Sequence, residues 1–185
     1  MPFDPAAYGP RIAQIFAMDQ NGERRMPLVG SGCSSPEALR HLEAEKASVL
    51  FAGARHPEEA MAGIWLYFSA LEQAHSLVQD LSSPEASFWH ATLHRQEPDE
   101  GNSAYWFRKV GRHTVYRDLT KRANEIVKAY TNAEFRPSHP WDPFGFIMLC
   151  ERARRQPGSE SELAAIEIQR AEWELLFDHC AKGKH

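Results

Sequence analysis

The residues Pro57–Glu97, with the sequence PEEAMAGIWLYFSALEQAHSLVQDLSSPEASFWHATLHRQE, carry the clearest structural pattern in the chain. In the first half of this stretch, apolar residues recur at spacings of three and four, at Ile64, Phe68, Leu71, Ala74 and Val78. Such spacing predicts one helix over Pro57–Leu81 that buries one face. The pattern resumes over Pro84–Glu97, so a second helix follows after two serines and packs beside the first as an antiparallel neighbour.

Helix signals continue on both sides of this pair. Ser35, His56 and Ser83 each precede a Pro-Glu dipeptide, which is typical of a helix start because Pro loses no hydrogen bond there and acids complement the helix dipole. Pro98 ends the second helix, and residues 99–102 (DEGN) are expected to form a turn. No alternating strand pattern occurs, so we predict an all-α, single-domain, irregular helical bundle. The other expected helices span Pro10–Met18, Ser103–Val110, Val115–Tyr130, Pro143–Arg155 and Ser159–Cys180.

Two stretches are expected to be irregular. Residues 1–34 are rich in Pro, Gly and Ser and predict an N-terminal arm with one short helix, which leaves residues 35–185 as the helical part of one domain overall. Gly30–Ser35 is interpreted as a flexible loop with a helix cap, because it lacks the flanking features of a phosphate loop. The aromatic loop Thr131–Pro143 is either a lid over a pocket or an ordered cover for the core.

Composition excludes several classes of protein. The chain has 185 residues and is 43% hydrophobic, which provides the core of one ordinary domain. Because 25 Asp and Glu outnumber 21 Lys and Arg, non-specific binding of nucleic acid is disfavoured. The chain starts without a signal-peptide pattern, and its apolar runs are far shorter than the roughly 20 residues that span a bilayer. Cys33, Cys150 and Cys180 form neither a disulfide framework nor a thiolate metal site, which favours a cytoplasmic location.

Polar residues at helical spacing mark the helix pair as a candidate metal site. Glu72 and His75 are three residues apart and therefore share a helix face. His90 and His94 are four residues apart, a spacing that lets two imidazoles bind one ion. With the two helices packed together, we expect a buried ligand set for a divalent metal (Zn, Fe, Mn or Ni), made by Glu72, His75, His90 and His94.

Acidic residues near these histidines suggest how such a site could act. Glu97 continues the face of His94, and either Glu97 or Asp99 is expected to be a further ligand or to orient an imidazole. If the protein is an enzyme, metal-bound water with Glu72 or Glu97 as the catalytic base suits the hydrolysis of a small substrate. The alternative is structural, with buried His and Glu side chains that only bond to one another.

Basic and aromatic residues interleave in the stretch Asn102–His113, NSAYWFRKVGRH. Arg108 and Arg112 are four residues apart and can clamp a carboxylate or phosphate. The same composition is compatible with stacking on RNA, which the acidity of the whole chain disfavours. Alternatively, the aromatic residues belong to the core and the arginines pair with the acids at positions 97, 99 and 100.

The stretch Trp89–Gly111 resembles a family of small, mainly bacterial proteins. Their shared motif is His-Ala-x-Leu-His-Arg-x-Glu-(Gly or Pro)-Asp-x-x-Asn-(Ala or Ser)-x-Tyr-Trp-(Tyr or Phe)-Arg, and this chain reads HATLHRQEPDEGNSAYWFR. The segments Trp141–Phe144 and Gln169–Trp173 are also similar, whereas Lys109 stands where a second Arg is expected. The family has no established activity, so the resemblance implies one site without its chemistry. That site comprises Glu72, His75, His90, His94, Arg95, Glu97, Asp99, Asn102, Tyr105 and Arg108.

Three functions are compatible with these patterns. The first is a divalent-metal site, hydrolytic if the protein is an enzyme, in which Arg95 and Arg108 bind an anionic group of the substrate. The second is a metal-free module that binds a small anion through Arg95, Arg108 and His94. The third is a structural or interaction protein. We predict the first, and a homodimer is the default expectation for assembly.

Overall fold

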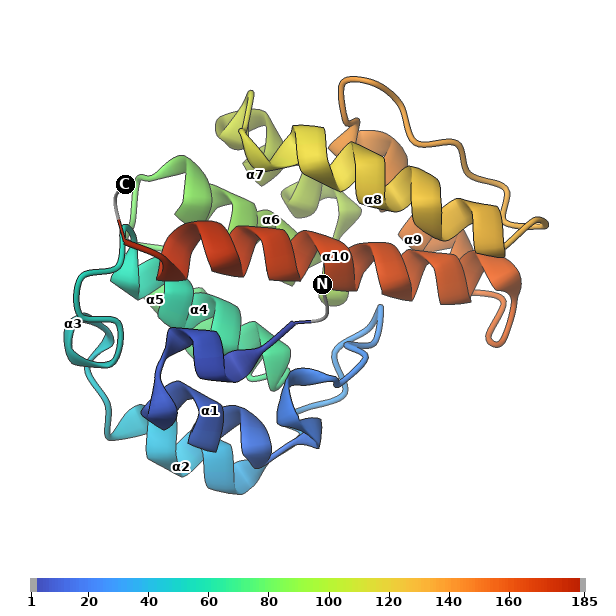
Figure 1. Ribbon diagram of the computed structural model, residues 1–185. Coiled ribbons are helices and arrows are strands. Elements are labelled where there is room, and N and C mark those ends of the chain that lie inside the picture. The colour runs from blue at the N-terminus through green and yellow to red at the C-terminus, as the bar shows by residue number, and fades with distance from the viewer. Residues whose placement is uncertain (1–2, 184–185) are drawn as a thin grey trace.

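The structure, a computed structural model, describes residues 3–183. Over this range the chain forms ten α-helices, two short 3-10 helices (Pro5–Tyr8 and Gln20–Gly22) and no β-strand (Figure 1). The prediction of an all-α, single-domain bundle is confirmed. None of the helices in the described part combines the length and apolar character that crossing a bilayer requires. The α-helices are α1 (Pro10–Ala17), α2 (Pro36–Glu43), α3 (Ala47–Leu50), α4 (Pro57–Tyr67), α5 (Leu71–Val78), α6 (Pro84–Gln96), α7 (Glu100–Val110), α8 (Val115–Ala129), α9 (Pro143–Ala153) and α10 (Glu160–Ala181).

Helix starts form where the sequence predicts them. The Ser35 Oγ accepts a hydrogen bond from the Ala38 N–H at 3.2 Å, and the Ser83 Oγ accepts one from the Ala86 N–H at 3.0 Å. Each hydroxyl satisfies an N–H that the first turn leaves without an intrahelical partner. All the helices expected after Ser83 are present, with ends shifted by a few residues.

The single helix predicted over Pro57–Leu81 is wrong, because the chain leaves helical geometry between α4 and α5. Ser69 has a φ of +56°, in the left-handed region that a helix interior excludes. The Ser34 N–H donates to the Phe68 carbonyl at 2.8 Å, and Arg24 Nη2 donates to the Ser69 Oγ at 2.9 Å. The bond from Ser34 occupies a carbonyl that a continuous helix would use, and the bond from Arg24 holds the Ser69 side chain, so α5 begins as a separate helix.

Helix α10 runs through the middle of the bundle and contacts α4, α8 and α9 (Figure 1). Trp173 of α10 donates from Nε1 to the carbonyl of Gly63 in α4 at 2.7 Å. A glycine is needed at position 63, because a Cβ there would lie 2.9 Å from the ring of Trp89 in α6 and 3.1 Å from the ring of Phe177 in α10. Phe16 packs edge-on to Trp173, with 5.9 Å between ring centroids, and Met26 is also buried. The N-terminal arm therefore contributes side chains to the core.

The loop Thr131–Pro143 is an ordered cover for part of the core. Its Trp141 is buried and packs against Phe146 of α9, with 5.4 Å between the ring centroids. Phe135 contacts the same two rings. The loop thus anchors α9 against the bundle, and its outer part borders a cleft next to α7 and α8.

Candidate functional site

Three histidines from α5 and α6 lie together, and we call His75, His90 and His94 the tris-histidine cluster. Their potential ligand atoms all lie within 4.8 Å of one another. The ring centroid of His75 is 4.6 Å from that of His90 and 5.7 Å from that of His94. The spacing of four within α6 and the packing of α5 against α6 bring the rings together. The arrangement is one that could bind a metal ion.

The cluster is enclosed on its α7 side. His90 is only 3% exposed, and its ring stacks on Trp106 with 3.8 Å between centroids and 15° between planes. The buried Nδ1 atoms of His90 and His94 have no hydrogen-bond partner among the described residues. Burial, with the nearby charges of His94, His75 and Lys109, lowers the pKa of His90 to about 4. This imidazole is therefore neutral near pH 7 and presents a lone pair.

The two glutamates predicted as catalytic occupy different surroundings. Glu97 follows the last residue of α6 and places Oε2 3.0 Å from Nδ1 of His94, an ion-pair contact without hydrogen-bond geometry. Glu72 is exposed and lines a separate groove with Trp65 and Leu42. The structure therefore does not bring Glu72 to the imidazoles. The break after α4 allows α5 to direct His75 toward α6 while Glu72 lies beside α4.

Arg95 lies in the core rather than in a ligand-binding site. Its guanidinium forms a bidentate pair with the carboxylate of Glu172, and each side chain is 1% exposed. The Arg95 Cζ also lies 4.6 Å from the centroid of the Phe146 ring. Neighbouring residues on a helix point about 100° apart, so Arg95 faces α9 and α10 although it follows His94 directly. Its expected role in binding an anion is corrected accordingly.

Asp99 and Asn102 form a helix cap. Asp99 Oδ1 accepts a hydrogen bond from the Asn102 N–H at 3.0 Å, and Oδ2 accepts one from Asn102 Nδ2 at 2.7 Å. These bonds lower the pKa of Asp99. The turn expected at positions 99–102 is instead the first turn of α7, which Asp99 starts. Both side chains are thus occupied without a ligand.

Replacing Asp99 by Ala is expected to cost about 1 kcal/mol of stability, the usual effect of losing a helix N-cap. Urea unfolding of Asp99→Ala measures the loss, and Asp99→Ser should recover most of it because a hydroxyl also caps. Both variants should bind as much zinc as the wild type. If Asp99→Ala binds less zinc than the wild type while Asp99→Ser binds as much, Asp99 contributes to the metal site.

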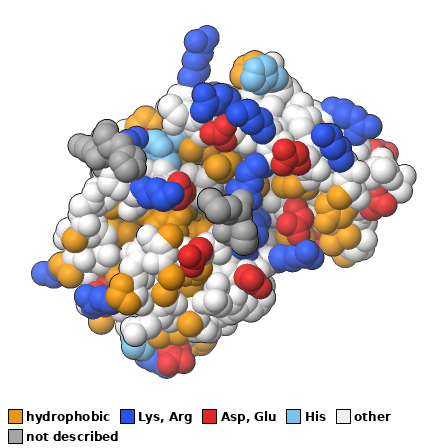
Figure 2. Space-filling view, viewed as in Figure 1, with side chains coloured by type: hydrophobic (Ala, Val, Ile, Leu, Met, Phe, Trp, Pro, Cys, Tyr) orange, Lys and Arg blue, Asp and Glu red, His pale blue; other side chains and the backbone are white. Residues whose placement is uncertain are grey.

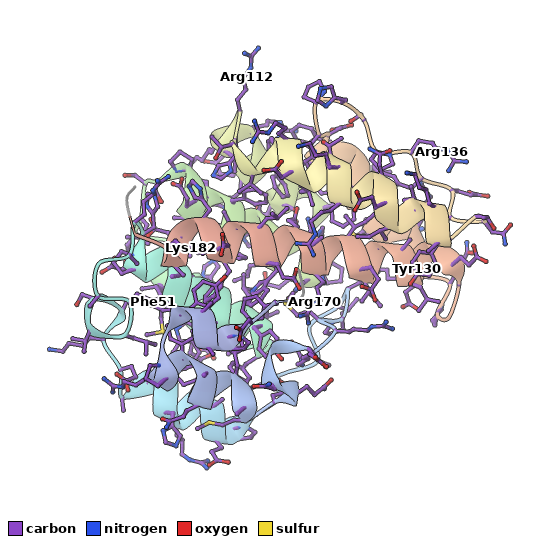
Figure 3. The ribbon with its side chains drawn as sticks, viewed as in Figure 1. Phe51, Arg112, Tyr130, Arg136, Arg170 and Lys182 are labelled. Atoms are coloured by element: carbon purple, nitrogen blue, oxygen red, sulfur yellow. The ribbon has the colours of Figure 1, made fainter. Side chains whose placement is uncertain are left out.

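Among the described residues, neither Tyr105 nor Arg108 of α7 forms a hydrogen bond or ion pair with the three imidazoles: the Tyr105 ring lies beside Trp106, with 5.4 Å between centroids, and Arg108 lies over the Phe144 ring. Tyr105 is 48% exposed, and Arg108 lines the cleft beside α7 and α8, which has a volume of about 810 Å³ and mostly apolar walls. Arg112 points away from the body of the protein (Figure 3). The three groups proposed for a metal-free anion site, Arg95, Arg108 and His94, therefore lie in three different environments.

The basic side chains of α7 and α8 lie largely at the protein surface. Figure 2 shows Lys and Arg side chains along the upper edge of this face, over α7 and α8. Arg117 and Lys121 of α8 pair with Asp118, and Arg122 pairs with Glu174. Within the described residues, Arg108 and Arg112 form no ion pair with the acids at positions 97, 99 and 100, so the pairing considered from the sequence is not formed. Lys109 differs from these, since its Nζ lies 4.2 Å from the centroid of the Trp106 ring that covers His90.

A second histidine and carboxylate group was missed from the sequence. It contains His56, Glu85 and His179, whose ligand atoms also lie within 4.8 Å of one another, and His113 contacts the same carboxylate. His56 and Glu85 were interpreted only as parts of helix starts. No local spacing links them to His113 or His179, so the sequence offered no signal for this group.

Comparison of the sequence with protein-family models, and of the protein with curated proteins and solved structures, found no match. We therefore infer the function from the geometry of the two histidine groups.

Proposed function

We propose that this protein binds one divalent transition-metal ion through His75, His90 and His94, and that the site hydrolyses a small anionic substrate. The main support is the convergence of three imidazoles, of which the buried Nδ1 atoms at His90 and His94 have no hydrogen-bond partner among the described residues. A buried nitrogen without a hydrogen bond lowers the stability of the folded protein. A metal ion bound to such a nitrogen would remove this loss.

The donor set favours zinc. Imidazole nitrogens suit Zn²⁺, Fe²⁺ and Ni²⁺, whereas Mg²⁺ and Ca²⁺ require oxygen ligands that this cluster lacks. Nitrogens at roughly 2.0–2.1 Å from a tetrahedral ion lie about 3.3 Å apart, so small side-chain rotations bring the cluster to that geometry. Three protein ligands leave one position open, which is the arrangement of hydrolytic zinc sites.

Two charged neighbours fit a hydrolytic role for the site. The carboxylate of Glu97 lies beside His94 and is part exposed, so it can accept a proton from an attacking water. Lys109 lies over Trp106 and adds a positive charge near His90, where it can attract an anionic group of the substrate. In this proposal Lys109 takes the role first assigned to Arg95 and Arg108.

Metal content tests the first half of the proposal. Protein stripped with a chelator, then dialysed against Zn²⁺ and buffer, is analysed for zinc. The double variant His90→Ala/His94→Ala should hold one equivalent less than the wild type, whereas His41→Ala, which changes an exposed histidine on α2, should hold the same amount. Equal zinc in wild type and double variant, both folded by circular dichroism, would exclude the site.

Glu97→Gln tests the second half. Against p-nitrophenyl phosphate and p-nitrophenyl acetate, the zinc-loaded wild type should show hydrolysis that Glu97→Gln lowers by roughly 10²–10⁴-fold, the usual contribution of a general base. Zinc content should stay unchanged in this variant. If both esters are hydrolysed equally by the two proteins, Glu97 is not the base; a zinc-loaded wild type inactive on a broader ester panel contradicts hydrolysis.

A further inference from the structure

Three imidazoles from distant parts of the sequence meet around one carboxylate oxygen of Glu85. Glu85, in the first turn of α6, is contacted by His56 before α4, His113 before α8 and His179 near the end of α10. The Nε2 atoms of His179, His113 and His56 lie 3.0, 3.5 and 3.7 Å from Glu85 Oε1. Three imidazoles that contact one carboxylate oxygen form a built cluster, unlike a single ion pair at the surface.

The distances from Glu85 to His56 and His179 are close to those between two ligands of one metal ion. Ligands held at roughly 2.0–2.1 Å from a tetrahedral ion are about 3.3 Å apart. The separations of Glu85 Oε1 from the Nε2 atoms of His179 and His56 lie on either side of this value. The side chains of His56 and His179 are 26% and 18% exposed, so the position is reachable from solvent.

His113 has a different role from the other two imidazoles. The Val115 N–H donates to its Nδ1 at 3.2 Å, so the neutral ring carries its proton on Nε2. That N–H faces Glu85 and cannot ligate a metal. His113 is therefore a positioning residue for Glu85.

Glu59 supports the group from the other side. Its Oε1 accepts a hydrogen bond from the Ser83 Oγ at 2.5 Å and lies 3.8 Å from Nδ1 of His56. A carboxylate behind the far nitrogen of a histidine orients the ring and makes it a better ligand. The Nε2 of His56 is thereby directed toward Glu85.

We propose that His56, Glu85 and His179 form a second metal site, for a Zn²⁺- or Fe²⁺-class ion bound by two imidazoles and one carboxylate. This ligand set leaves coordination positions open and is typical of such ions. Glu85 and His90, the nearest cluster member along α6, are five residues apart, about 7.5 Å along the helix axis and about 140° around it, and the two groups share no residue. The site is thus distinct from the tris-histidine cluster, and its ion joins the start of α4 and the start of α6 to the end of α10.

Zinc analysis in a His94→Ala background separates the two proposals. His94→Ala should bind one equivalent of Zn²⁺ through the second site, His94→Ala/His179→Ala none, and His94→Ala/His41→Ala again one. Where the His179 change prevents folding, His56→Ala replaces it, because the ring of His56 is partly exposed. A folded His94→Ala protein without zinc, or zinc retained after both His56 and His179 are replaced, overturns the second site and leaves the tris-histidine test unaffected.

The positioning role of His113 has its own measurement. Titration of the His94→Ala protein with Co²⁺, followed by visible absorption, should give one site. His113→Ala in this background should weaken Co²⁺ binding by roughly 10–100-fold without changing the stoichiometry at saturation. His113→Gln should recover part of the affinity, because its amide N–H can still donate to Glu85. An unchanged affinity in a folded His113→Ala variant contradicts the role.

Discussion

Glu172→Ala is expected to destabilise the protein by about 3–5 kcal/mol, because it leaves the buried guanidinium of Arg95 without its counter-charge. For a chain of this size that loss corresponds to a fall in melting temperature of roughly 6–20 °C. The two side chains are each 1% exposed and bond in a bidentate arrangement. Water cannot replace the lost carboxylate without opening the core, so the full cost of the unpaired charge is retained. Urea unfolding and calorimetry both measure this effect.

Two further variants show that the loss comes from an unpaired charge. Glu167→Ala, also on α10, removes an exposed pair with Arg25 and should cost less than about 1 kcal/mol. Arg95→Met/Glu172→Leu removes both charges together and should be clearly more stable than Glu172→Ala. The double variant should also retain zinc, since Arg95 is not a ligand. A cost below about 1 kcal/mol for Glu172→Ala would show that the pair is solvated.

Zinc is expected to raise the melting temperature of the stripped wild-type protein. At 100 times its dissociation constant, an ion that binds only the folded chain adds about 2.7 kcal/mol per site. This stabilisation corresponds to a shift of roughly 5–11 °C. His75→Ala should lose the part of the shift that belongs to the tris-histidine cluster, and His41→Ala should keep all of it.

The choice of cation makes the thermal measurement specific. Mg²⁺ at the same concentration should leave the melting temperature unchanged, because the tris-histidine cluster offers no oxygen ligand and the second site offers a single carboxylate, too few for this ion. Addition of a chelator should reverse the effect of Zn²⁺. Equal shifts with Zn²⁺ in wild type and His75→Ala would place the stabilising ion outside the tris-histidine cluster.

Local patterns were good predictors where the chemistry is local. The caps at Ser35 and Ser83 bond within their own first turns, so a Ser-Pro-Glu sequence is enough to locate them. The pairing of His90 with His94 follows from the helical repeat alone. The turn predicted at positions 99–102 is wrong, since Asp99 caps α7 there, and its carboxylate is expected to be a ligand because a capping Asp and a binding Asp look alike in sequence.

The break at Ser69 and the position of Arg95 could not be predicted in this way. The spacing around Ser69 favours a continuous helix, and only the hydrogen bonds that Ser34 and Arg24 bring from far along the chain disrupt it. Arg95 follows a histidine of the candidate site and was grouped with it. Its partner Glu172 lies 77 residues away, and no local pattern relates the two.

The amino-acid order therefore specified most of the helices, the caps at Ser35 and Ser83 and the histidine pair of α6, because each depends on residues within one or two turns of each other. The packing of the helices specified which charges are buried, how His75 meets His90 and His94, and that His56, Glu85, His113 and His179 converge. Those outcomes depend on how helix faces fit together across the core, and the free energy of that fit is shared among many side chains far apart in the chain.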